Sequence, residues 1–177
     1  MTAHLDDLLH AHGFDDFRWI AGSDVLVEQW VRFKCTYACR QFGKHALCPP
    51  NAPSIGECRE LFQSYERIAL IHMEKALAEG EDAADWKRNV NARLLELERD
   101  VFLAGFHKVL VTFPADCSVC ADCVTSKQDC RHKGKARPTP DALGVDVYGT
   151  ARQAGMPIFV LTERSQTMNR YALMLVE

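Results

Sequence analysis

The sequence predicts an α+β or α/β fold, built as a single layered domain over residues 1–177 with a mixed central sheet and helices packed on it. A length of 177 residues suits one hydrophobic core. Short apolar runs typical of buried strands occur between segments with helical periodicity. Eight cysteines fall into two groups, at about residues 35–58 and 117–130, which predicts two cysteine-rich metal-binding loops beside the core.

The N-terminal segment predicts a helix and then a strand. Leu5 to His12 suits a short helix that ends at Gly13. Between Val25 and Phe33, apolar and polar side chains alternate with a period of two, which indicates a strand leading directly into Cys35.

The first cysteine group begins in a predicted loop. Residues 36–54 contain a glycine and three prolines, which break regular structure. Ser54 is followed three residues later by Glu57, a capping box that starts a helix carrying Cys58.

The middle of the chain predicts two strands around one long helix. Ile68 to Met73 is a short apolar strand. From Trp86 to Ala104, apolar residues recur at three or four positions, as on one face of an amphipathic helix that ends at Gly105. Val109 to Phe113 is a further apolar strand, and it leads into Cys117.

The C-terminal segment predicts a helix over 141–154 and two closing strands, over 158–161 and 171–176. Both cysteine groups therefore start within four residues of a predicted strand end. If those two strands run parallel, the groups lie along one edge of the sheet, close to each other.

Composition and charge limit the classes of function. The first residues are acidic, and no apolar run reaches the roughly 20 residues that span a bilayer, so we expect a cytoplasmic protein with no membrane contact. In a reducing cytosol, clustered cysteines bind metal or perform redox chemistry more often than they form disulfides. The net charge of −3 argues against a broad nucleic-acid surface.

The second cysteine group has the spacing C-x2-C-x2-C-x6-C and consists of Cys117, Cys120, Cys123 and Cys130. Consecutive C-x2-C steps are the ligand spacing of bacterial [4Fe-4S] clusters. Zinc more often takes two separated pairs of cysteines. The residue after Cys130 is an arginine, whereas ferredoxins have proline there.

The first group has the spacing C-x3-C-x8-C-x9-C and consists of Cys35, Cys39, Cys48 and Cys58. This pattern suits either iron or zinc. The thiolate of Cys58 would be stabilised by the N-terminus of its helix. The four-plus-four arrangement predicts two iron–sulfur clusters, with two zinc sites, or reactive or merely buried cysteines, as alternatives.

Other polar residues could assist these sites. A histidine could replace one thiolate, although hydrogen bonding at the surface is the commoner role for His45, His72, His107 and His132. Basic residues gather between Lys127 and Arg137, opposed only by Asp129. Cations beside a negatively charged cluster would stabilise its reduced form and present a face to an acidic redox partner. The alternative interpretation of this segment is a run of surface charges that water solvates and that has no functional role.

These motifs resemble a family of small prokaryotic proteins described as predicted metal-binding proteins (domain of unknown function 2284). The resemblance rests on Cys35-Thr-Tyr-Ala-Cys39-Arg-Gln-Phe-Gly43 with Cys48-Pro-Pro, on the second cysteine group, and on Gly144-Val-Asp-Val, and it spans about residues 30–160. This chain has Phe42-Gly43 where the family typically has Tyr-Gly. The resemblance implies metal binding, and the family's prevalence in anaerobes favours oxygen-sensitive clusters.

Three functions are consistent with the sequence. The first is an electron-transfer or redox-accessory protein with two clusters, because no organic-cofactor motif is present. The second is an enzyme whose first cysteine group leaves an iron open to substrate, with Lys44, His45 or Asn51 as polar neighbours. The third is an interaction module stapled by zinc.

Overall fold

A four-stranded antiparallel sheet forms the centre of the protein. The computed structural model describes residues 2–76, 83–163 and 165–177. The strands are β1 (Phe17–Ile20), β2 (Ile68–Lys75), β3 (Leu110–Val111) and β4 (Met168–Leu175), in the order β1-β2-β4-β3. This confirms an α+β fold. Every pair of neighbouring strands is antiparallel, so the sheet is not mixed and the α/β alternative does not apply.

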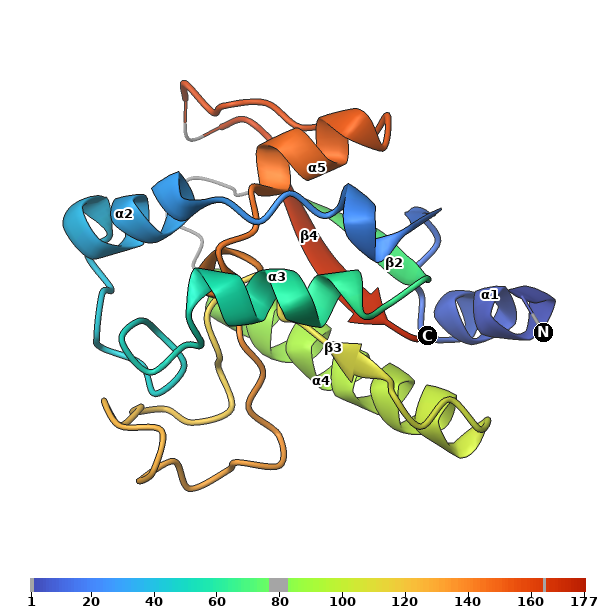
Figure 1. The fold of residues 1–177 in the computed structure, drawn as a ribbon, viewed down its shortest axis with the longest axis horizontal. Helices are drawn as coiled ribbons and strands as arrows, with labels where there is room; N and C mark the ends of the chain where they lie inside the picture. The colour runs from blue at the N-terminus through green and yellow to red at the C-terminus, as the bar shows by residue number, and fades with distance from the viewer. Residues whose placement is uncertain (1, 77–82, 164) are drawn as a thin grey trace.

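Five helices surround the sheet (Figure 1): α1 (Thr2–Ala11), α2 (Gln29–Ala38), α3 (Ile55–Gln63), α4 (Ala84–Leu103) and α5 (Val147–Gln153). Two 3-10 turns precede helices in the chain: η1 (Gly22–Asp24) lies between β1 and α2, and η2 (Asp141–Leu143) lies between β3 and α5. The predicted capping box of α3 is present: the Glu57 amide donates to the Ser54 hydroxyl, and the Ser54 amide donates to the Glu57 carboxylate. Within the described residues, no helix is long and apolar enough to cross a membrane.

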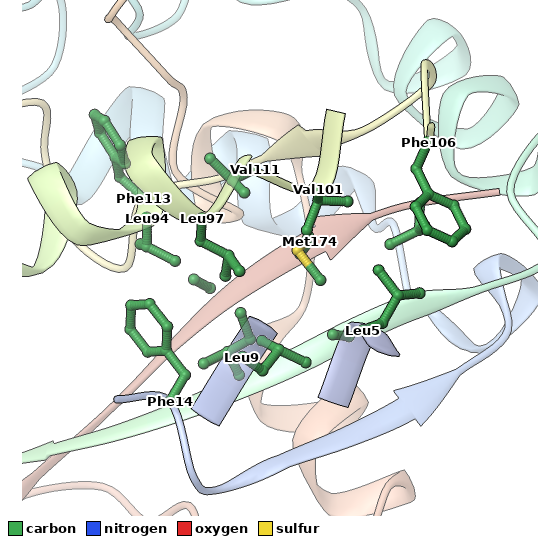
Figure 2. Packing of buried hydrophobic residues seen from close by; sticks show 14 of the residues in the cluster. Leu5, Leu9, Phe14, Leu94, Leu97, Val101, Phe106, Val111, Phe113 and Met174 are labelled. Atoms are coloured by element: carbon green, nitrogen blue, oxygen red, sulfur yellow. The ribbon is translucent and has the colours of Figure 1, made fainter. Parts of the chain in front are cut away.

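One face of the sheet packs against α1 and α4. Met174 of β4 lies near Leu5 and Leu9 of α1 on this face (Figure 2), and Ile71 of β2 belongs to the same hydrophobic cluster. The same cluster includes the buried stripe of α4, which consists of Val90, Leu94, Leu97 and Val101. The apolar stripe that the sequence predicted for the long helix is therefore a core face.

The other face packs against α3 and the segments around α5. Leu70 and Leu173 alternate with the residues of the first face and contact a second cluster that includes Phe62 of α3 and Ala151 of α5. The period of two along β2 and β4 thus divides their side chains between two layers, because successive residues of a strand point to opposite faces.

The segment 25–33 is not a strand. Val25 and Val27 are buried, and Val27 forms only an isolated bridge with Val145. The chain then enters α2, in which Val31 is the buried residue. The alternation that indicated a strand is real at Val25 and Val27, but the next buried position lies four residues on, which is a helical spacing. Cys35 consequently lies on a helix.

Two C-terminal predictions also need correction. The helix expected over 141–154 is divided into η2 and α5 at Gly144, whose φ of +78° is left-handed and ends the first turn. Residues 158–161 form no strand, and Phe159, Val160 and Leu161 are exposed. Their apolar character therefore does not reflect a place in the core.

Candidate metal centre

The four cysteines of the second group line one small cavity. Cys117, Cys120, Cys123 and Cys130 are all partly buried, and His45 and His132 also line this cavity. Its free volume is about 10 Å³. The structure brings together the complete set of thiols that the spacing singled out.

Helix α4 anchors both ends of the second loop. At its start, Lys87 forms an ion pair with Asp116 at 3.1 Å, and the Asn91 side-chain amide donates to the Ser118 hydroxyl at 3.0 Å. At its end, the Arg137 guanidinium donates to both carboxylate oxygens of Glu98 at 2.6–3.1 Å. Three residues of α4 thus anchor the loop: Lys87, Asn91 and Glu98.

The environment of Cys117 combines burial with amide donors. Burial raises the pKa of the Cys117 thiol, and the nearby Cys123 and Cys120 raise it further. The backbone amides of Val119 and Arg137 oppose this rise in pKa because they stabilise the thiolate. Amide hydrogen bonds to cysteine sulfur are among the interactions that set the potentials of iron–sulfur clusters.

Three cysteines of the first group line a second, larger cavity. Cys35 lies on α2 and Cys39 is its C-cap, so the two are one helical turn apart. Cys48 follows in the loop, with its backbone amide bonded to the His45 carbonyl at 3.0 Å. All three border a cavity of about 570 Å³.

Cys58 does not border the cavity that these three share. It is only 1% exposed and belongs to the hydrophobic cluster beneath α3, where its thiol contacts the Pro53 carbonyl at 3.8 Å. Burial raises the pKa of the Cys58 thiol, and Arg32 lowers it. Among the residues described, Cys58 lines neither cysteine cavity. Its role as a ligand stays a prediction.

Burial raises the pKa of two thiols of the first group, those of Cys35 and Cys48. Burial raises the pKa of Cys35, followed by the carboxylate of Asp141 and the neighbouring Cys39. Burial also raises the pKa of Cys48, whereas the backbone amide of His45 lowers it. Metal binding at these thiols must therefore displace protons.

The two cysteine groups lie side by side. Figure 1 shows the loop that follows α2 and the loop before η2 on the same side of the molecule, away from both termini. Cys117 and His45 each border both cavities, and the charge of Cys123 acts on Cys48. The Asn51 side-chain amide donates to the Thr125 carbonyl at 2.7 Å and joins the loops directly.

Parallel strands, which we expected to bring the two groups together, do not do so. The sheet is antiparallel, and Cys35 follows no strand. The loops meet through Asn51 and through their shared cavity walls.

The four histidines considered as possible ligands separate into two pairs. His45 and His132 line the cavity of the second group, and Nδ1 of His45 is buried without a hydrogen-bond partner among the described residues. His72 is buried in the sheet, where it bonds Asp16 and Asn169, both at 2.7 Å, and His107 is exposed. His72 and His107 line neither cysteine cavity.

Sequence reasoning missed several residues that shape the site. Asn91 and Glu98 are buried polar residues on α4, each directly after a residue of the apolar stripe. The sequence signal for such residues is a polar side chain next to the apolar stripe of a helix. A polar group that becomes buried there needs a hydrogen-bond partner from another segment. Asp141 had no such signal, and only the fold places it at the wall of the first cavity.

Fold and site together define an α+β protein with two adjacent groups of cysteines on one side of its core. In the part of the chain that the structure describes, no three Cys, His, Asp or Glu side chains are close enough to hold a single metal ion. The family model described as "Predicted metal-binding protein (DUF2284)" matches residues 18–176, and the chain belongs to this family. No curated protein and no solved structure shows detectable similarity to it.

Proposed function

We propose that this protein is a cytoplasmic iron–sulfur protein that carries two adjacent [4Fe-4S]-type clusters and transfers electrons to a partner enzyme. One cluster is held by Cys117, Cys120, Cys123 and Cys130, and the other by the group of Cys35, Cys39 and Cys48. The observation that carries the proposal is that four cysteines in cluster spacing line one cavity, whose wall is shared with the cavity of the first group. Bound clusters would supply one-electron transfer.

The donor set fits iron–sulfur clusters better than zinc. Consecutive C-x2-C steps crowd three thiolates around one tetrahedral ion, whereas a cube offers each thiolate an iron of its own. The two cavities also adjoin, and short separation favours electron exchange between clusters. The amides beside Cys117 would stabilise the negative charge of a reduced cluster.

We propose that an acidic partner protein docks beside the second cluster. Lys127, Arg131, Lys133 and Lys135 are exposed, while Arg137 is held by Glu98 and anchors the loop. Next to this segment lies a groove of about 780 Å³ that combines apolar residues of α4, such as Phe102, with the basic Lys135. An apolar floor with a basic rim suits an acidic partner by charge complementarity.

Metal and acid-labile sulfide analysis of protein purified without oxygen tests the proposal. We expect about eight iron and eight sulfide per chain, as two four-iron clusters require. Reduced protein should show magnetic coupling between two paramagnetic centres by EPR. Cys123→Ala serves as the control, because loss of one cluster should abolish the coupling. Colourless protein with stoichiometric zinc would overturn the proposal in favour of a zinc-stapled interaction module.

A second candidate function is supported by the position of Cys58. Because three cysteines of the first group face a cavity of about 570 Å³ and the fourth lies in the hydrophobic cluster, a cluster there would have one iron without a cysteine ligand. Such an iron can bind a substrate, which makes an enzyme of this class the alternative. His45 borders the cavity, whereas Lys44 and Asn51 do not line it.

A further inference from the structure

Helix α2 carries a stripe of aromatic side chains on its solvent side. Trp30, Phe33 and Tyr37 are 49–79% exposed, and their spacing of three and four residues places them along one side of the helix. The rings of Phe33 and Tyr37 stack, with their centroids 5.8 Å apart. Val31, on another side, is the buried residue of α2. A surface helix normally turns polar residues to water, so this aromatic stripe indicates a contact surface.

A second exposed apolar segment adjoins the stripe. Phe159, Val160 and Leu161 are consecutive residues after α5, and all three are exposed. The Tyr148 hydroxyl of α5 donates a hydrogen bond to the Phe159 carbonyl at 3.4 Å, and Tyr148 borders the same cavity as Trp30. Figure 1 shows α2, α5 and the segment after α5 on one side of the molecule, away from α4.

Together these side chains form one surface, which we call the apolar patch. It consists of the stripe on α2, Tyr148 and residues 159–161. It contains seven of the ten large hydrophobic side chains that are exposed in the described part of the chain, whereas apolar residues on an ordinary surface are scattered singly. The patch contains no cysteine, so what it binds is independent of the proposed iron–sulfur function.

Cations accompany the aromatic rings of this patch. The Lys34 ammonium lies over the Trp30 ring at 5.9 Å, and the Arg152 guanidinium lies over the Tyr148 ring at 5.8 Å. Glu163 is the only acidic residue in α2, α5 and residues 158–163, all of which the structure describes. The patch thus presents apolar groups together with a net positive charge.

Charge and residue types favour an anionic lipid surface over a second copy of the chain. A two-fold dimer through the patch would oppose the same cations across its interface. Anionic headgroups instead attract lysine and arginine side chains. Tryptophan and tyrosine rings suit the depth of the headgroups, because one end of each ring is apolar and the other is polar. Aliphatic side chains next to them can enter the boundary of the acyl chains.

We propose that the apolar patch docks this protein on an anionic phospholipid surface. Phe33, Val160 and Leu161 enter the boundary of the acyl chains, and Lys34 and Arg152 contact headgroup phosphates. Docking of this kind needs no membrane-spanning segment, whose absence was the reason to expect no membrane contact. It would hold the cavity of the first cysteine group at the membrane, because residues of α2 line that cavity.

Co-sedimentation of the anaerobically purified chain with vesicles tests the proposal. The probes are vesicles of phosphatidylcholine alone and vesicles of phosphatidylcholine and phosphatidylglycerol in equal parts. We expect saturable binding to the anionic vesicles, about tenfold or more tighter than to the neutral ones and weakened by added salt, because each cation near the headgroups contributes. No binding to the anionic vesicles, or equal binding to both kinds, would overturn the proposal.

Two matched variants connect the binding to the patch. Val160 and Leu103 are 68% and 65% exposed, but Leu103 ends α4, outside the patch. Val160→Asp should weaken binding to the anionic vesicles by about tenfold or more, because it removes an apolar side chain and repels the headgroups. Leu103→Asp should bind like the wild type. Circular dichroism checks that both variants are folded, and unchanged binding of Val160→Asp or equal weakening by both would overturn the proposal.

A third variant tests the charge. Arg152→Gln keeps the apolar side chains of the patch and should weaken binding to the anionic vesicles about fivefold, with a smaller dependence on salt. Unchanged binding would overturn the assignment of the cations to the headgroups.

Sedimentation velocity without lipid tests a second copy as the occupant of the patch. We expect a monomer. A dimer that Val160→Asp dissociates and Leu103→Asp does not would show that the patch is covered by its own copy, and would overturn the lipid proposal.

Discussion

Replacing Cys58 with alanine distinguishes a core cysteine from a cluster ligand. Cys58 is 1% exposed in a hydrophobic cluster with Phe62 and Ile55, and it borders neither cysteine cavity. We therefore expect Cys58→Ala to keep the iron and sulfide content of the wild type. Its effect should instead appear as a loss of stability, because a buried sulfur is removed from close packing.

The magnitude of this loss follows from the burial. Removing a buried group the size of a methylene costs about 0.8 kcal/mol in transfer free energy, and an unfilled cavity adds a similar amount. The expected decrease in the free energy of unfolding is about 1–2 kcal/mol. For a chain of this length that corresponds to a Tm decrease of about 2–8 °C.

The assay compares Cys58→Ala with Cys39→Ala in protein purified without oxygen. Cys39 is exposed and lies at the end of α2 beside the first cavity, so Cys39→Ala should lose about half of the iron. Thermal unfolding followed by circular dichroism gives the change in Tm. An equal loss of iron in the two variants would show that Cys58 is the fourth ligand of the first cluster, and the reasoning from burial would be refuted.

Four further outcomes test other parts of the structure. Cys123→Ala should lose about half of the iron and sulfide, since no substitute thiol is available, and full retention would exclude the second group as a cluster site. Glu98→Ala removes the acceptor of the buried Val111 amide and the carboxylate partner of the partly buried Arg137, and should lower the free energy of unfolding by about 1–3 kcal/mol in urea, whereas the exposed Glu96→Ala should change it little. Chelation should loosen the cysteine loops but preserve the far-ultraviolet circular dichroism, because both hydrophobic clusters consist mainly of apolar side chains from the helices and the sheet; a fully unfolded metal-free chain would contradict this. The Ser54 hydroxyl and amide lower the pKa of Glu57, so their stabilisation is present above its ordinary pKa and is lost as pH falls through the lowered one. Ser54→Ala should therefore weaken the dependence of stability on pH in this acidic range, and an unchanged dependence would show that the pair does not couple to folding.

Local sequence patterns predicted the elements in which apolar residues recur with the spacing of a helix or form a short apolar run typical of a strand. The apolar stripe of α4, the capping box at Ser54 and the runs of β2 and β4 needed no knowledge of distant residues. The strand predicted after Val25 is not formed, because two alternating valines suit either a strand or an extended entry into a helix, and the chain continues into α2 with Val31 buried.

The sequence by itself determined the family, a layered fold of sheet and helices and the grouping of the cysteines, because ligand spacing and hydrophobic periodicity are properties of neighbouring residues. Only the structure decided for α+β, because strand direction depends on how distant segments pair. Tertiary structure decided which thiols share a cavity. It separates Cys58 from Cys35, Cys39 and Cys48, because α3 turns that side chain into the hydrophobic cluster. It also joins the two loops through Asn51 and Thr125 and places Trp30 and Tyr148 beside one cavity. These residues are distant in sequence, and packing of helices on the sheet brings them together.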